Sequence, residues 1–286
     1  MADLSLLAAR VQYPLDGVPF HQWTTDGPLS FAFYRTRDGY LLRFAELADF
    51  QVSADGRHVT GVPAPGAPLA TVEHLYLNQV LPLILSRSGK LVLHGSSVDV
   101  GACAIAFLAD TGHGKSTLAA AFAIDGCPFL TDDGVLLDPV GAGYTVIPSH
   151  PSIRLWEDSQ DALLPHDALT APPVLYTEKC RYVAGSELSH RDRPQPLGAV
   201  YVLGPGDVAN IEMRRLEPGQ AVAAAMQHAF ILDIEDRSSL AAHFDRLAKF
   251  AVSVPCFHLD YPRCYEALPR VIRAIRAHAA SQGCDP

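Results

Sequence analysis

The chain has 286 residues, of which 49% are hydrophobic and 19% are charged, and its formal net charge is −9. A chain of this length can bury a large core, and this composition is typical of a folded protein rather than a disordered one. Acidic residues outnumber basic ones and no Lys/Arg cluster stands out, so the basic surface that nucleic-acid binders need is missing and we expect no nucleic-acid partner.

The N-terminal residues 1–5 lack the charged and apolar regions of a signal peptide, and no run of about 18 apolar residues could span a bilayer. The sequence therefore predicts a cytoplasmic protein with no membrane partner. Several of the cysteines lie in apolar runs, where a thiol packs as a small hydrophobic group, so we expect buried free thiols. The six cysteines form no CxxC pair; they are Cys103, Cys127, Cys180, Cys256, Cys264 and Cys284.

Residues 29–62 alternate apolar and polar side chains around two turn signals, at residues 37–39 and 54–56. Alternation of this kind, interrupted by Asp-Gly turns, is typical of antiparallel hairpins. We therefore expect residues 1–68 to form a small β-rich N-terminal module.

A helix is expected after the Pro/Gly-rich residues 63–66. Thr71 is a candidate N-cap, and the apolar face continues to about residue 86. Pro82 is expected to kink this helix or end it early. We place the start of a second domain, residues 69–286, at this helix.

The next segments alternate between strands and helices. Apolar residues 91–93 and 103–108 are expected to be strands, and the second runs directly into a glycine-rich loop. A helix is expected over residues 115–124, followed by a third apolar segment at 127–130. This order predicts an α/β core with a mixed sheet. The clearest elements further along are a strand at 197–203, helices at 218–229 and 238–251, a strand near 256–259 and a final helix at 268–280.

The glycine-rich loop, called the glycine loop below, is Ala109-Asp110-Thr111-Gly112-His113-Gly114-Lys115-Ser116-Thr117. Phosphate-binding loops need glycines so that backbone N–H groups converge on phosphate oxygens, a lysine for the β/γ-phosphates and a hydroxyl for magnesium. Lys115 and Ser116 meet the last two needs, and the helix that begins here adds its positive end. Ala109 stands where the standard pattern has glycine, and His113 is expected to be an exposed variable position. The sequence predicts a P-loop that binds ATP with Mg²⁺.

Two adjacent carboxylates, Asp132 and Asp133, follow the apolar residues 127–130 at an expected strand end. One of them can bind magnesium and the other can accept the proton of an attacking hydroxyl. Spacing alone does not say which carboxylate has which role. The alternative is purely structural, because Asp-Asp-Gly is also good turn chemistry.

Further candidates are a histidine and three cations. His94 follows the strand at residues 91–93, so it is a candidate for a role beside the phosphates, although a lone histidine is often structural. Arg154, Lys179 and Arg181 could neutralise a phosphoryl group in transfer, although most such residues are solvated surface groups.

Three segments together resemble the catalytic domain of HPr kinase/phosphorylase, a bacterial protein-serine kinase whose fold is related to phosphoenolpyruvate carboxykinase. They are residues 94–100 (His-Gly-Ser-Ser-Val-Asp-Val), the Gly-Lys-Ser-Thr end of the glycine loop, and residues 130–133 (Leu-Thr-Asp-Asp). The match covers about residues 88–140, and more loosely the stretch to the C-terminus. The resemblance implies an α/β fold with a P-loop kinase core of this type behind the β-rich N-terminal module.

Three further, less specific segments resemble those of the shorter HPr-kinase-like proteins of peptide biosynthesis, including kinases that phosphorylate the C-terminal serine of lasso peptide precursors. These segments are residues 77–82, 153–156 and 259–263. Ser152 stands where HPr kinases have the acidic residue of a Glu-x-Arg segment. Because of this departure, the resemblance leaves open both the phosphorylase activity and HPr as substrate.

The resemblance implies ATP and Mg²⁺ as cofactors and a role for each motif residue. The residues implied to be catalytic are Asp132 as base, His94, Lys115 and Arg154, and those implied to serve the metal are Ser116 and Asp133. We expect a serine kinase that acts on a peptide or protein, and a homo-oligomer is compatible with the sequence. The alternatives are a small-molecule kinase on the same fold and a nucleotide-binding regulator that transfers nothing.

Overall fold

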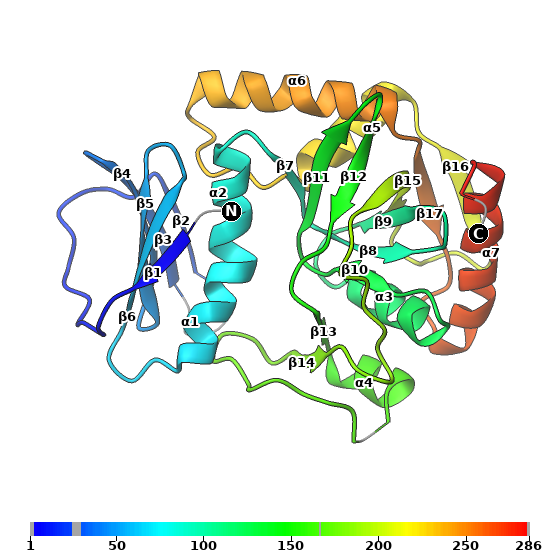
Figure 1. Cartoon of the computed structure of the whole chain (residues 1–286), viewed down its shortest axis with the longest axis horizontal. Helices are drawn as coiled ribbons and strands as arrows, with labels where there is room; N and C mark the ends of the chain where they lie inside the picture. The colour runs from blue at the N-terminus through cyan, green and yellow to red at the C-terminus, as the bar shows by residue number, and fades with distance from the viewer. Residues whose placement is uncertain (1–2, 25–29, 166, 285–286) are drawn as a thin grey trace. The chain divides into compact units, whose positions relative to one another are not determined.

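The computed structural model describes residues 3–24, 30–165 and 167–284, and the chain divides into two compact units (Figure 1). Unit 1 comprises Met1–Lys90, Pro172–Glu178 and Ile231–Leu240. Unit 2 comprises Leu91–Ala171, Lys179–Phe230 and Ala241–Pro286.

Unit 1 contains a β-sheet with the strand order β1-β6-β5-β4-β3-β2. Strands β2 to β6 pair antiparallel with their neighbours, whereas β1 pairs with β6 in parallel. This confirms the antiparallel hairpins predicted from the alternating pattern; Leu29, the first residue of that pattern, lies outside the described residues. The strands are β1 (Asp3–Leu6), β2 (His21–Thr24), β3 (Ser30–Thr36), β4 (Gly39–Phe44), β5 (Ala48–Ser53) and β6 (His58–Pro63).

A helical segment packs on this sheet. Val72, Leu75 and Ile84 on its apolar face are completely buried and share one core with Phe44 and Phe50 of the sheet. Because this segment completes the core of unit 1, the first part of that unit extends to Lys90. The sequence predicts an earlier domain boundary, at residue 69. The segment consists of α1 (Leu69–Leu75), the π-helical turn η1 (Tyr76–Val80) and α2 (Leu81–Arg87).

The start of this segment differs from the prediction. The N-cap is Pro68 in an extended conformation, and no side chain caps the helix. Thr71 lies inside α1, where it is buried and accepts a hydrogen bond from the backbone N–H of Leu175 (3.3 Å). Pro82 neither ends nor interrupts the segment, because it falls in the first turn of α2 directly after the wide π turn.

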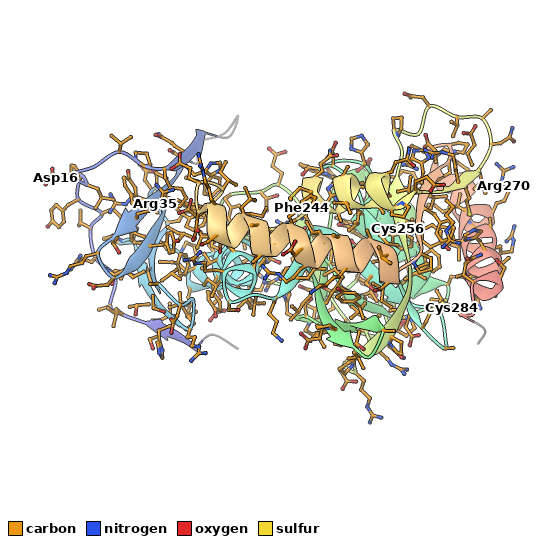
Figure 2. All side chains as sticks on the ribbon, turned by 90° about the horizontal axis from the view of Figure 1, so that it is seen from above. Asp16, Arg35, Phe244, Cys256, Arg270 and Cys284 are labelled. Carbon is orange, nitrogen blue, oxygen red and sulfur yellow. A yellow bond between two sulfur atoms is a disulfide. The ribbon has the colours of Figure 1, made fainter. Side chains whose placement is uncertain are left out.

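Ion pairs join the later segment 231–240 to the rest of unit 1. Arg35 of β3, labelled in Figure 2, donates to the Asp233 carboxylate through Nε and Nη2, each at 2.7 Å. Arg87 donates to Asp236 at 2.6 Å. These contacts explain why a stretch so distant in sequence belongs to the N-terminal unit.

Unit 2 contains a mixed sheet that runs β10-β8-β9-β15-β12-β11-β7, with β17 beside β15 and β16 beside β17. Strands β9, β15 and β17 are parallel, and the remaining pairs are antiparallel. The structure thus confirms the mixed sheet. The strands are β7 (Leu91–Leu93), β8 (Gly95–Asp99), β9 (Ala104–Leu108), β10 (Phe129–Thr131), β11 (Val135–Val140), β12 (Gly143–Ile147), β15 (Gln195–Leu203), β16 (Glu212–Arg215) and β17 (Cys256–Asp260).

Helices cover both faces of this sheet. Phe107 and Tyr201 belong to the core formed with α3 and α7, whereas Ala106 and Val200, one residue away in each strand, belong to the core formed with α5 and α6. Burial on both faces explains why β9 reads as a continuous apolar run. The helices are α3 (Lys115–Ile124), α4 (Glu157–Leu163), α5 (Pro218–Gln227), α6 (Arg237–Ser253) and α7 (Leu268–Ser281), with the short 3₁₀ turn η2 (Tyr265–Ala267) before α7.

The predicted helix over residues 115–124 is confirmed to the residue, and the later helices and strands are found within a few residues of their predicted bounds. Strand β8 was not predicted, because its sequence Gly-Ser-Ser-Val-Asp is largely polar and only its place between β9 and β10 buries it. A separate ribbon of β13 (Ser152–Leu155) and β14 (Cys180–Val183) was also missed. Within the described residues, no helix is both long and apolar enough to cross a membrane.

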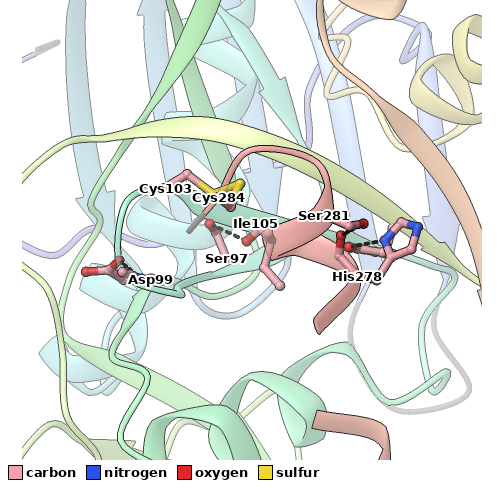
Figure 3. Close-up of a disulfide and its surroundings, with 9 residues drawn as sticks. Ser97, Asp99, Cys103, Ile105, His278, Ser281 and Cys284 are labelled. Carbon is pink, nitrogen blue, oxygen red and sulfur yellow. Dashed lines mark hydrogen bonds between the residues drawn. A yellow bond between two sulfur atoms is a disulfide. The ribbon is translucent and has the colours of Figure 1, made fainter. Parts of the chain in front are cut away.

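The expectation of free thiols is wrong for two cysteines. Cys103, which precedes β9, and Cys284, which follows α7, form a disulfide with their Cα atoms 5.4 Å apart (Figure 3). They are 181 residues apart in sequence, so spacing could not reveal the pair. Cys127 and Cys256 are buried free thiols as expected, whereas Cys180 and Cys264 are free but exposed.

Candidate functional site

The glycine loop connects the end of β9 to the start of α3. Gly112 and Gly114 have φ angles of 86° and 81°, a left-handed conformation that is strained for any residue with a side chain. Gly114 is the N-cap of α3, and a glycine has no side chain with which to cap the first backbone N–H groups of the helix. The loop and the helix start therefore present backbone donors and a positive dipole end together, which suits an anion.

Ala109 occupies the position where a glycine was expected. Among the described residues, the only non-glycine residues with a positive φ are Glu46 and Asp133, so Ala109 has an ordinary negative φ. The alanine is buried at 2% exposure. Its backbone conformation does not require glycine, which removes the conflict between this residue and the loop pattern.

Lys115 is largely buried, and its ammonium lies against the loop backbone. Its Nζ donates to the carbonyls of Ala109 (2.7 Å) and Asp110 (3.0 Å). Burial lowers the pKa of Lys115, and the nearby Asp132 and Asp133 oppose that effect. The loop thus holds a cation whose charge is favoured by the two predicted carboxylates.

Asp132, at the end of β10, binds the hydroxyl of the glycine loop. Its Oδ1 accepts hydrogen bonds from Ser116 Oγ (2.9 Å) and from Ser96 Oγ of β8 (2.6 Å). Its Oδ2 accepts one from the backbone N–H of Arg154 (3.1 Å). Three segments distant in sequence therefore meet at one carboxylate that is only 4% exposed.

Asp133 forms a different set of contacts. Its φ of 66° is rare for a residue with a side chain, and its carboxylate pairs with Arg154, which donates through Nε (2.7 Å) and Nη2. Burial alone would raise the pKa of Asp133, but Arg154, with help from His94 and Lys179, lowers it to about 2. The segment does form the turn that its sequence favours, and Asp133 is held ionised within it.

His94 lies beside Asp133. Its Nδ1 is 2.9 Å from the backbone carbonyl of Asp133, and because a carbonyl only accepts, Nδ1 carries the proton. Burial and the nearby Lys115 lower the pKa of His94, so the ring is neutral near pH 7 with Nε2 as its acceptor nitrogen. The ring also packs edge-to-face on Phe230.

Lys115, Asp133 and His94 line a cavity of about 390 Å³ within unit 2. Asp132 is buried and is connected to the cavity through its hydrogen bond with Ser116. One side, which we call the phosphate side, is made of residues 111–117 of the glycine loop with His94, Asp133 and Arg154. The other side was not predicted from the sequence and is called the aromatic wall. Its residues are Pro205, Tyr261, Arg263, Cys264, Tyr265 and Leu268.

The three cationic candidates separate in the structure. Arg154 and Lys179 both line the cavity, and the Lys179 ammonium lies 5.3 Å from the ring centroid of Trp156. Arg181 lies opposite Arg154 in the β13–β14 ribbon and is not among the described residues that line the cavity. Of the three, Arg154 and Lys179 are therefore the ones placed to contact a ligand in this cavity directly.

The remaining loop residues have distinct surroundings. His113 is half-buried rather than exposed as expected, and its Nδ1 is shielded without a hydrogen-bond partner among the described residues. Asp110 is exposed and accepts a hydrogen bond from Gln227 (3.1 Å). Thr111 lines the cavity, and Thr117 Oγ1 lies 2.9 Å from Ser159 Oγ of α4.

The described side chains do not form a complete metal site by themselves. Among the described residues, no group of three or more His, Cys, Asp or Glu side chains could hold a metal ion alone. Ser116 and Asp132 provide adjacent oxygen ligands, and Mg²⁺ typically combines one or two carboxylates with substrate phosphates and water. This pair fits magnesium bound together with a nucleotide, whereas the Asp133 carboxylate is already engaged by Arg154.

No protein-family model matches the chain, and no curated protein sequence is significantly similar to it. Among solved structures, the chain is similar to the HPr(Ser) kinase/phosphatase from Coxiella burnetii. The likeness covers 67% of this chain and 98% of that one, at 11% sequence identity and a TM-score of 0.36. At this level neither fold nor function can be carried over from that protein.

Proposed function

We propose that this chain is an ATP-dependent phosphotransferase that transfers the terminal phosphate of ATP to a serine hydroxyl of a peptide or protein. The hydrogen bond between Ser116 Oγ and Asp132 Oδ1 carries the proposal. It joins the hydroxyl at the start of α3 to a carboxylate at a strand end, which is how P-loop NTPases arrange the two groups that hold Mg²⁺.

The glycine loop supplies the phosphate-binding groups in this proposal. Backbone N–H groups around Gly112 and Gly114 and the positive end of α3 hold phosphate oxygens, and Lys115 neutralises charge on the β/γ-phosphates. Positioning and charge neutralisation provide most of the catalysis in phosphoryl transfer, so little covalent participation by the protein is needed.

The contacts favour a different role for each of the two carboxylates, Asp132 and Asp133. Magnesium held by Ser116 and Asp132 would neutralise charge on the phosphates. The resemblance implies the reverse, with Asp132 as base and Asp133 at the metal. We favour Asp132 at the metal because it binds Ser116 directly, whereas Asp133 pairs with Arg154.

The acceptor hydroxyl then approaches the phosphate side near His94 and Asp133. Its oxygen bonds to the terminal phosphorus as the bond to the β-phosphate oxygen breaks, ADP leaves, and the hydroxyl proton passes to one of these two residues. His94 Nε2 is an unprotonated acceptor, and the Asp133 carboxylate is ionised. Arg154 keeps Asp133 charged and contributes positive charge beside the transferred group.

Mass spectrometry after incubation with ATP, Mg²⁺ and a panel of acceptors tests this function. The panel contains serine peptides, among them lasso precursors that end in serine as the resemblance implies, and small hydroxylated metabolites. A phosphoserine peptide formed by the parent but not by Lys115→Ala supports the proposal. A phosphorylated metabolite alone would indicate a small-molecule kinase, and tight ATP binding without any product would indicate a regulator.

A further inference from the structure

The aromatic wall has no part in the function proposed above, yet it shares the cavity with the phosphate side. Two contacts connect it to the glycine loop. A Cβ built on Gly114 would lie 3.8 Å from the Tyr261 hydroxyl, so the end of this side chain lies beside the loop. Ser159 Oγ lies 2.9 Å from Thr117 Oγ1 and 3.1 Å from the Tyr265 hydroxyl.

The direction of these hydrogen bonds follows from Tyr265. Its single hydroxyl proton is donated to the Asp158 carboxylate (2.9 Å), so the hydroxyl must accept from Ser159. Ser159 then accepts from Thr117. This chain of bonds holds the Tyr265 ring at a constant position relative to the loop residue that follows Ser116.

Arg263 and Tyr261 form a second flat surface in the wall. The Arg263 guanidinium lies 3.8 Å from the Tyr261 ring centroid and donates to the carbonyls of Gly204 (2.6 Å) and Tyr261 (3.2 Å). A Cβ on Gly206 would come within 2.1 Å of Arg263 Cγ, so the glycine allows the arginine to pack here. A surface held by stacking and by two hydrogen bonds is preorganised for a ligand.

Two adjacent hydroxyl side chains at the start of α3 form hydrogen bonds towards different sides of the cavity. Ser116 binds Asp132, on the side proposed to hold magnesium and the terminal phosphate, whereas Thr117 binds Ser159 and through it the wall. A nucleotide whose terminal phosphate is near Asp132 would therefore extend its nucleoside towards Tyr265. The cavity volume of about 390 Å³ is within the range of small-molecule sites.

We propose that the aromatic wall is the subsite for the purine base of a nucleoside, which stacks on the flat surfaces of Tyr265 and the Arg263–Tyr261 pair. The Asp158 carboxylate and the Tyr265 hydroxyl are the polar groups within reach of the base edge. This inference rests on the proposed function for the orientation of the nucleotide, but it is tested by nucleoside binding alone.

Cys264 provides a probe inside the wall. It is an exposed free thiol that lines the cavity, and Cys180 is the other exposed free thiol among the described residues. In Cys180→Ser, maleimide alkylation reports on Cys264. We expect saturating ATP or adenosine to slow this alkylation at least tenfold and tripolyphosphate to leave it unchanged. Cys264→Ser is the matched control, in which alkylation of Cys180 should not respond to adenosine.

Tyr265→Ala provides an independent measurement by calorimetry. It should weaken ATP and adenosine binding at least tenfold while leaving tripolyphosphate affinity unchanged. Tyr265→Phe, which keeps the ring, should lose much less affinity for ATP and adenosine.

Protection of Cys264 by tripolyphosphate but not by adenosine would overturn the base subsite. If ATP binds and is turned over without protecting Cys264, the subsite fails and the kinase stands. Adenosine protection without any transfer product supports the subsite and refutes the kinase, and no binding of either ligand overturns both.

Discussion

The two sides of the cavity in unit 2 are built from different kinds of sequence. The phosphate side comes from residues 94–154 and uses residues of a restricted type: glycines with positive φ, a lysine, a serine and the carboxylate of Asp133. The aromatic wall combines Pro205 with residues 261–268, and many flat or apolar side chains could form it. A site is therefore recognisable in sequence where its chemistry restricts the residue type, and it is not recognisable where it requires only shape.

The two sides also differ in electrostatics. On the phosphate side, Lys115 and Asp133 are buried, as is the neighbouring Asp132, and each is engaged in hydrogen bonds or an ion pair. In the wall, the Arg263 guanidinium stacks on the Tyr261 ring and donates to backbone carbonyls. We therefore expect changes on the phosphate side to act on transfer rate and metal affinity, and changes in the wall to act on nucleotide affinity.

The largest effect is expected for Lys115→Ala. Removing a preorganised cation from the phosphates should lower kcat by about 10²–10³-fold, similar to the loss of one electrostatic stabiliser in other enzymes. Lys179→Ala is the matched control, because Lys179 contacts the Trp156 ring, and it should cost less. Steady-state kinetics measures both variants, and near-normal turnover of Lys115→Ala would contradict the role of the loop.

The two aspartates provide the next test. Asp132→Asn should raise the Mg²⁺ concentration needed for half-maximal nucleotide binding, because an amide is a poorer ligand than a carboxylate. Asp133→Asn should leave that concentration nearly unchanged and lower the transfer rate by about 10²-fold. Magnesium titrations at fixed ATP, with transfer followed in the same samples, separate the two roles. The opposite pattern would restore the assignment that the resemblance implies.

A smaller effect is expected for the glycine loop backbone. Gly114→Ala should lose about 1–2 kcal/mol of stability, because φ is 81° at this position, and should also weaken ATP binding. Gly219→Ala is a matched control in α5, where an added Cβ meets nothing within 4 Å and φ is not positive. Denaturant unfolding of both variants measures the difference; equal stability would show that the loop relaxes without strain.

The surroundings of the phosphate side predict a dependence of stability on pH. Burial lowers the pKa of His228 to about 4, whereas an unfolded histidine titrates near 6.5. Between these pH values the unfolded chain binds the extra proton, so stability is fully present above pH 6.5 and falls as the pH drops towards 4. Thermal melts should show a shallower decline for His228→Asn. An unchanged decline would mean that other groups cause it.

The smallest effect is expected for Ala109→Gly. Because Ala109 has a negative φ, glycine adds unfolded-state freedom without relieving strain, and stability should fall by about 0.5–1 kcal/mol. ATP affinity should change less than threefold. A large loss of binding would show that the buried methyl group positions the loop.

The local features that backbone chemistry dictates were predictable from the amino-acid sequence. The glycine loop leading into a helix at Lys115, the alternating strands of unit 1 and the apolar strands of a mixed sheet were all predicted and are present. Each depends on residues close together in the chain: glycine for positive φ, alternation for a half-buried strand, and continuous apolar runs for a strand buried on both faces.

Contacts between groups that are distant in sequence became visible only in the folded unit. Ser96 reaches Asp132 because the polar strand β8 is buried between two neighbours, and Cys103 finds Cys284 across 181 residues. Arg154 forms an ion pair with Asp133, and Tyr265 is connected to the glycine loop through Ser159 of α4. Such contacts depend on how the whole unit packs. The residues next to a side chain in the sequence therefore do not indicate which distant residue it will contact.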